Sequence, residues 1–110
     1  MYEQGEIVVV PFPFSDLSSI RQRPVLILSK NVDIKTSEDL ITCGITSNIK
    51  NAPHSILIEN KDLAKGNIPV KSRIKIDKIF TLDKDIIIKK VAQINKETLA
   101  KVKKEFIQLV

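Results

Sequence analysis

The sequence feature that most constrains the fold is a series of short runs of β-branched and apolar residues, each bounded by proline, glycine or polar residues. Residues 7–10 form one such run between Gly5 and Pro11, and residues 25–28 form another directly after Pro24. Such runs are typical of β-strands, and a continuous apolar run is typical of a strand buried on both faces. The chain is therefore predicted to be mainly β.

Alternation of apolar and polar residues predicts four further strands, at residues 40–46, 54–59, 70–76 and 86–94. In the first of these, Ile41, Cys43 and Ile45 would share one face. The intervening segments, residues 11–19, 31–39, 60–69 and 77–84, are rich in proline or polar residues and are predicted to be loops or bends. Residues 60–69 and 77–84 could each include a short helical turn.

The chain is predicted to close with a helix over residues 96–109. Asn95 is a favourable N-cap, and an apolar stripe recurs at helical spacing, formed by Leu99, Val102, Phe106 and Leu109. Several short strands followed by one helix predict a single domain, residues 1–110. Its architecture would be a small, mostly antiparallel β-barrel with the helix packed on it.

Charge and cysteine content narrow the setting in which the protein works. The formal charge of +5 favours association with polyanions such as nucleic acid or an acidic protein segment. The one cysteine, Cys43, cannot form an intramolecular disulfide, and no run reaches the roughly 18 apolar residues of a membrane span. The start of the chain does not resemble a signal peptide. We expect a cytoplasmic protein.

The common catalytic devices are missing from the sequence. With three glycines there is no phosphate-binding glycine loop, and a serine triad would have to use the only histidine, His54, which opens a predicted strand. Cys43 alternates with Ile41 and Ile45, as a small buried apolar side chain would. Scattered carboxylates do not make a metal site, so no metal and no cofactor are expected.

Arginine and hydroxyl residues remain as candidates. Arg23 stands directly before Pro24, which favours an extended conformation at the entrance of a buried strand. A guanidinium fixed there can bind a phosphate through two parallel hydrogen bonds, and the hydroxyls of Thr46 and Ser47, at the end of another strand, could complete a phosphate site. The structural alternatives are an ion pair of Arg23 with Asp16 or Glu6, and an ordinary strand role for Thr46.

Three blocks of the sequence resemble one family. The opening GEIVVVPFPFSD with RQRPVLILS, the strand end ITS and the segment SRIKIDKIFTLDK follow one another as in the MazF/PemK toxins of type II toxin–antitoxin systems, with PFPFSD most similar to the PemK-like branch. The resemblance implies an SH3-like barrel related to CcdB and MazF, and a homodimer. It also implies a metal-independent endoribonuclease that cuts single-stranded RNA at short motifs and leaves 2′,3′-cyclic phosphate and 5′-hydroxyl ends. The expected partners are RNA and a cognate antitoxin.

The family motifs place the expected site on particular residues. The catalytic arginine before proline and the catalytic threonine at a strand end fall on Arg23 and Thr46. The loop between the first two strands would help to bind RNA, through Ser15, Asp16, Ser18, Ser19 and Arg21, and the third block would read bases through Asp77 and Lys78. Some relatives carry a glycine- and acid-containing loop before the arginine, whereas this loop contains only Asp16 as an acid.

In the mechanism that the resemblance implies, the RNA 2′-hydroxyl attacks its own phosphate. Arg23 is suited to stabilise the phosphorane because it stays charged, and for the same reason it is a poor acid or base. Two alternatives stay open. A CcdB-like toxin has the same barrel but acts on gyrase, and a non-catalytic SH3-like module would bind RNA or a protein partner and leave it intact.

Overall fold

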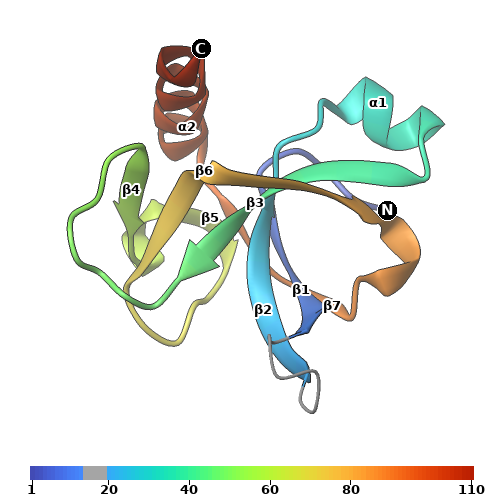
Figure 1. Cartoon of the computed structure of the whole chain (residues 1–110), viewed down its shortest axis with the longest axis horizontal. Coiled ribbons are helices and arrows are strands. Elements are labelled where there is room, and N and C mark those ends of the chain that lie inside the picture. The colour runs from blue at the N-terminus through green and yellow to red at the C-terminus, as the bar shows by residue number, and fades with distance from the viewer. Residues whose placement is uncertain (14–19) are drawn as a thin grey trace.

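β-strands dominate the structure, a computed structural model that describes residues 1–13 and 20–110. In these residues seven strands form one antiparallel sheet in the order β4-β6-β3-β2-β1-β7-β5 (Figure 1). The strands are β1 (Glu6–Pro13), β2 (Ile20–Ile27), β3 (Asp39–Thr46), β4 (Ser55–Ile58), β5 (Leu63–Gly66), β6 (Ser72–Asp83) and β7 (Lys89–Ile94). The helices are α1 (Asn31–Thr36) and α2 (Lys96–Leu109), with 3₁₀ turns η1 (Asn60–Asp62) and η2 (Lys84–Ile86).

The sheet curls into a half-barrel whose central strands are buried on both faces. In β2, Leu26 belongs to a first apolar cluster with residues of β3, β6, β7 and α2, whereas Val25 and Ile27 belong to a second cluster with Val8 of β1 and Ile34 of α1. All three β2 side chains are at most 1% exposed. This confirms the predicted strand buried on both faces and the predicted fold, a mainly antiparallel barrel-like sheet with a C-terminal helix.

Helix α2 begins where the sequence predicts. The Asn95 side-chain oxygen accepts a hydrogen bond from the Thr98 backbone N–H at 2.8 Å, the geometry of an N-cap. Val102 is 1% exposed, and Leu99 and Leu109 pack against the first cluster. Phe106, the fourth member of the predicted stripe, is 37% exposed and therefore only partly packed. Neither described helix has the length and apolar composition of a membrane span.

The predicted loop at residues 11–19 begins too early. β1 continues through Pro11 to Pro13, and β2 already includes Arg21 and Arg23. β7 pairs with β1 only as far as Val9, so the later part of β1 has one open side. Proline is compatible with a strand that has an open edge, because its missing N–H need not serve a ladder there.

Two predicted connections contain regular structure. Residues 31–39 were predicted as a loop, but α1 forms there because Ile34, 2% exposed, anchors an otherwise polar segment on the second cluster. Residues 60–69 contain η1 and the short edge strand β5, which pairs with β7. Strand β7 begins at Lys89 rather than at residue 86, since η2 occupies the preceding residues.

The predicted bend at residues 77–84 is wrong in most of its length. β6 runs on to Asp83, and its second half pairs with β3 through Cys43 and Ile79. Gly44, the next residue of β3, pairs with Lys75 instead, so residues 76–78 form a bulge with no partner on β3. Polar bulge residues within a long strand produce a turn-like sequence pattern, which explains the error.

Gly66, at the end of β5, is required by the backbone. Its φ is +75°, and a Cβ there would lie 2.3 Å from the Val91 carbonyl oxygen. We expect Gly66→Ala to lower the free energy of unfolding by about 2–5 kcal/mol, the sum of left-handed strain and overpacking. Urea denaturation measures this. Gly44→Ala is the matched control, because its Cβ would sit 3.7 Å from the nearest side-chain atom. An equal loss in both variants would contradict the argument.

Candidate functional site

A groove with a volume of about 740 Å³ opens along β2, β3 and β6, beside Arg23 in the middle of β2 and Thr46 at the end of β3. Four segments line it: β2, β3, the loop that follows β3, and β6. Their lining residues are Arg23, Pro24, Val25, Gly44, Ile45, Thr46, Asn48, Lys50, Ala52, Lys75, Asp77, Lys78, Ile79 and Phe80. Four of the predicted site residues are in this set.

Arg23 and Thr46, the two predicted catalytic residues, both line this groove. The pairing of β2 with β3 extends to Val25 and Gly44. Arg23 and Thr46 each lie two residues beyond this pair, on the sheet face that carries Val25 and Gly44. Both residues are half-buried, so a guanidinium from β2 and a hydroxyl from β3 face the same groove.

The Thr46 hydroxyl has a fixed role in the backbone that follows it. Its Oγ1 accepts a hydrogen bond from the Asn48 backbone N–H at 3.1 Å. Because a hydroxyl both accepts and donates, this contact orients the oxygen while leaving its proton for another acceptor. A phosphate oxygen in the groove would be such an acceptor.

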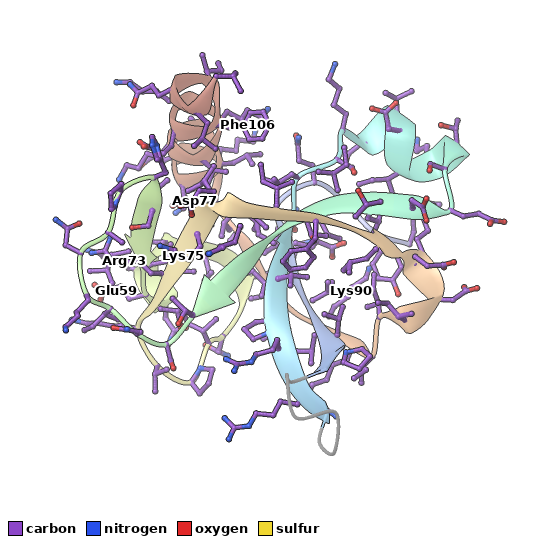
Figure 2. The ribbon with its side chains drawn as sticks, viewed as in Figure 1. Glu59, Arg73, Lys75, Asp77, Lys90 and Phe106 are labelled. Atoms are coloured by element: carbon purple, nitrogen blue, oxygen red, sulfur yellow. The ribbon has the colours of Figure 1, made fainter. Side chains whose placement is uncertain are left out.

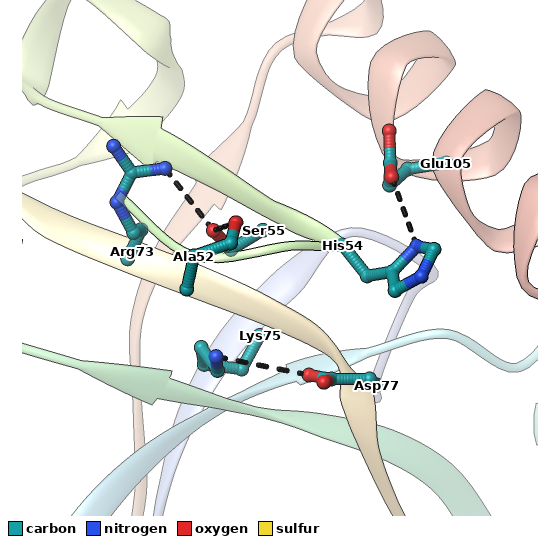
Figure 3. Close-up of polar contacts among 7 residues, drawn as sticks. All are labelled: Ala52, His54, Ser55, Arg73, Lys75, Asp77 and Glu105. Atoms are coloured by element: carbon teal, nitrogen blue, oxygen red, sulfur yellow. Dashed lines mark hydrogen bonds and ion pairs between the residues drawn. The ribbon is translucent and has the colours of Figure 1, made fainter. Parts of the chain in front are cut away.

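The β6 bulge supplies the opposite wall. Asp77 and Lys78 have no partner on β3 and line the groove. The Lys75 Nζ lies 3.9 Å from the Asp77 Oδ1, a loose ion pair at the edge of the bulge (Figure 3). Bulges redirect side chains out of the regular alternation of a strand, and they recur next to functional sites. The bulge therefore lets β6 present consecutive side chains to the groove.

Arg73 holds the loop that contributes Asn48, Lys50 and Ala52 to the groove. Its Nε donates to the Ile49 carbonyl at 3.3 Å, and its Nη1 donates to the Ser55 hydroxyl at 3.1 Å. The Ser55 hydroxyl in turn donates to the Ala52 carbonyl at 2.6 Å (Figure 3). Along β6, Arg73 is followed by Lys75 and Asp77 (Figure 2). One arginine thus ties both ends of the loop to the sheet.

The groove carries an excess of positive charge. Among the described residues that line it, four side chains are cationic, Arg23, Lys50, Lys75 and Lys78, and one is a carboxylate, Asp77. A concave surface lined by one sign of charge concentrates the field and attracts ligands of the opposite sign. The floor between these cations is apolar, with Val25 and Ile45 among its residues. This combination suits a ligand that has both anionic and flat apolar parts.

Of the remaining predicted RNA-binding residues, the two that the structure describes, Ser47 and Arg21, are not among the groove-lining residues. Ser47 is exposed beside Thr46, and Arg21 is exposed on β2, two residues before Arg23 and on the same face. Ser15, Asp16, Ser18 and Ser19 lie outside the described residues. The role of this loop in RNA binding stays a prediction.

Sequence reasoning missed several lining residues. Lys75 lies in the strand predicted at residues 70–76, on the polar face of its alternating pattern, but only the strand register shows that this face meets the groove. Lys50 and Asn48 lie in a turn that carries no motif. Phe80 was inside the predicted bend, and its membership of β6 is what brings it to the groove.

The histidine and the cysteine lie away from the groove lining. His54 Nδ1 lies 3.2 Å from the Glu105 Oε1 on α2 (Figure 3). The His54 carbonyl accepts from the Ile76 N–H at 3.0 Å. Cys43 is fully buried, and this burial raises the pKa of its thiol to about 12. In the described part of the chain, no three side chains of the metal-ligating types gather into a cluster.

Comparison with known proteins identifies one family that covers almost the whole chain. A family model described as "PemK-like, MazF-like toxin of type II toxin-antitoxin system" matches residues 3–110. Comparison with curated protein sequences finds no match.

Solved structures share the fold at low identity. A MazE–MazF complex from Deinococcus radiodurans aligns with a TM-score of 0.79 at 20% identity, over 98% of this chain and 94% of its own. An endoribonuclease in complex with its cognate antitoxin, from a mycobacterial species, aligns with a TM-score of 0.78 at 19% identity. The alignment covers 98% of this chain and 93% of the mycobacterial chain. The toxin MazF-mt6 of Mycobacterium tuberculosis gives 0.74 at 16% identity, over 94% and 93%.

Proposed function

Because this chain belongs to the PemK-like, MazF-like toxin family of type II toxin–antitoxin systems, we propose that it is an endoribonuclease that cuts single-stranded RNA. The cleavage is selective for short sequence motifs and inhibits translation and growth. The observation that carries the proposal is that Arg23 and Thr46 line one groove, whose described lining residues include four cations and one carboxylate. The RNA backbone supplies the anions that such a groove attracts.

The proposed reaction uses the nucleophile that RNA itself provides. The 2′-oxygen forms a bond to the adjacent phosphorus and loses its proton, the bond from phosphorus to the 5′-oxygen breaks, and that oxygen gains a proton. The products are a 2′,3′-cyclic phosphate and a 5′-hydroxyl. No metal takes part in this scheme. The charge grows on the phosphate oxygens, where the Arg23 guanidinium stabilises it, and the Thr46 hydroxyl donates a further hydrogen bond.

The proposed protein partners are a cognate antitoxin and a second copy of this chain. Two of the structurally similar proteins are described in complex with an antitoxin. An acidic antitoxin segment is complementary to the cationic groove and would exclude RNA from it. A homodimer is supported by exposed apolar side chains on β3, β6 and α2: Ile41 is 47% exposed, Ile79 is 43% exposed and Ile107 is 70% exposed. Burial in an interface would remove these surfaces from water.

The experiment that tests the function is cleavage of a mixed-sequence single-stranded RNA by the purified protein in the presence of EDTA. We expect fragments with 5′-hydroxyl ends, and sequencing of those ends will give the cleavage motif. Parallel supercoiling assays with DNA gyrase test the alternative that the protein is a CcdB-like toxin that acts on gyrase. RNA that binds with salt-dependent affinity and stays intact would instead identify a non-catalytic module.

Thr46→Ala should reduce the cleavage rate by about tenfold or more, the usual scale for one lost transition-state hydrogen bond. The measurement is single-turnover cleavage of an RNA that carries the mapped motif. Thr46→Ser is the matched variant, since it keeps the hydroxyl and should retain most of the rate. Equal losses in the two variants would show that packing of the threonine methyl group, rather than its hydroxyl, is what matters.

A further inference from the structure

Phe80 is an aromatic ring held in place within the cationic groove. It lies on β6 opposite Thr42, whose buried hydroxyl donates to the Phe80 carbonyl at 2.9 Å. The ring packs against the second apolar cluster, and its Cε1 would lie 3.9 Å from a Cβ built on Gly44. The side chain is nevertheless only partly buried and lines the groove. Strand pairing and the core therefore fix the ring while part of it remains accessible.

The surroundings of the ring define what could bind to it. Gly44 has no side chain, and a Cβ there would be in ordinary van der Waals contact with Phe80, so the ring lies close to the β3 backbone at the groove floor. Cations surround this floor, with Arg23 on β2 and Lys75 and Lys78 on β6. A flat apolar group with an anion attached to it matches this arrangement. A nucleobase on its sugar phosphate is such a group, and base stacking on aromatic side chains is a common mode of single-strand binding.

We propose that Phe80 is a base-stacking platform and that a nucleobase of the bound RNA lies against its ring. This inference rests on the proposed function, because it requires RNA in the groove, and it adds a base-binding subsite to it. The contact is made by the base and not by the reacting phosphate. It should therefore contribute to binding of the ground state and the transition state alike, and affect KM rather than kcat.

The first test measures binding directly. The chain contains no tryptophan, so Phe80→Trp introduces a single indole whose emission reports on its surroundings. Titration with a short single-stranded RNA should quench this emission if a base stacks on the ring. Tyr2→Trp is the matched control, because Tyr2 packs against the same apolar cluster but is not among the groove-lining residues. Unchanged Phe80→Trp emission with RNA bound, shown by anisotropy of labelled RNA, would overturn the inference.

The second test separates stacking from packing. Phe80→Leu keeps an apolar side chain but removes the ring, and we expect KM for RNA cleavage to rise roughly tenfold to a hundredfold with kcat nearly unchanged. Phe80→Tyr should restore the KM, and Tyr2→Leu should not change it. On RNA in which the stacked nucleotide lacks its base, the wild type and Phe80→Leu should have equal KM values. The abasic nucleotide and the Phe80→Leu substitution each remove the same contact, the one between base and ring.

The outcomes distinguish this inference from the proposed function. Two outcomes would show that Phe80 is only a core residue and that the inference is wrong. In the first, the wild type cleaves RNA and Phe80→Leu has the same KM. In the second, Phe80→Leu raises KM by the same factor on every abasic RNA, whichever nucleotide lacks its base. If the wild type binds RNA but cuts none, the endoribonuclease proposal fails, while quenching of Phe80→Trp still decides the stacking. If the wild type does not bind single-stranded RNA, both fail.

Discussion

Arg23→Ala is expected to abolish RNA cleavage while the protein stays folded. Arg23 lines the same groove as Thr46, and a guanidinium is not deprotonated in proteins. A single preorganised donor to a developing oxyanion contributes about a hundredfold to a thousandfold in rate, and a charged, bidentate donor belongs at the upper end. The fold should persist because Val25 and Leu26, which anchor β2, remain buried in the two clusters.

The measurement is single-turnover cleavage of the mapped RNA, combined with circular dichroism and thermal unfolding of each variant. Arg23→Lys separates charge from geometry, because lysine keeps the positive charge but lacks the planar fork, and we expect only a small part of the rate to return. Lys101→Ala removes one positive charge from the exposed surface of α2 and controls for net charge. Wild-type cleavage by folded Arg23→Ala would refute the assignment of Arg23.

Local signals predicted the elements that the sequence alone can specify. The apolar strand predicted at residues 25–28 and the cap of α2 at Asn95 depend on side-chain chemistry within a few residues. The cap is confirmed, and the strand is confirmed as far as Ile27, although it begins earlier, at Ile20. Family resemblance added the SH3-like barrel, where local patterns predicted only a small, mostly antiparallel barrel. Burial of Cys43 also followed from simple alternation along its strand.

Register and bulges are set by tertiary pairing, and these are what the sequence patterns missed. The shift between Cys43 and Gly44 makes residues 76–78 a bulge and keeps β6 in the sheet to Asp83. The predicted bend at residues 77–84 therefore had the right polar residues but the wrong structure. This shift also brings Phe80 to the groove, and no local signal marks that position as a site. Alternation placed Ile41 with Cys43, yet Ile41 is 47% exposed because the curled sheet leaves that part of the face uncovered.

Replacing the ribose at the scissile position by 2′-deoxyribose is expected to stop cleavage completely. The proposed reaction has no other nucleophile, because the 2′-oxygen forms the new bond to phosphorus. The groove contacts that we assign to Arg23 and Thr46 reach the phosphate, so the deoxy substrate should still bind with nearly the affinity of RNA. The loss would therefore appear in the chemical step and leave binding almost unchanged. Gel analysis of cleavage and anisotropy of the same labelled oligonucleotide measure the two quantities.

The control is the same oligonucleotide with deoxyribose one position further along, which should be cut at a rate close to that of RNA. Two results would contradict 2′-hydroxyl attack: cleavage of the deoxy substrate, or fragments from RNA that carry a 3′-hydroxyl and a 5′-phosphate. Such fragments require water as the nucleophile, and a water must be deprotonated and positioned by the protein. Asp77 is the one carboxylate lining the groove among the described residues, and it lies 3.9 Å from the Lys75 ammonium. Attack by the 2′-hydroxyl needs no positioned water, since the substrate holds its own nucleophile next to the phosphorus.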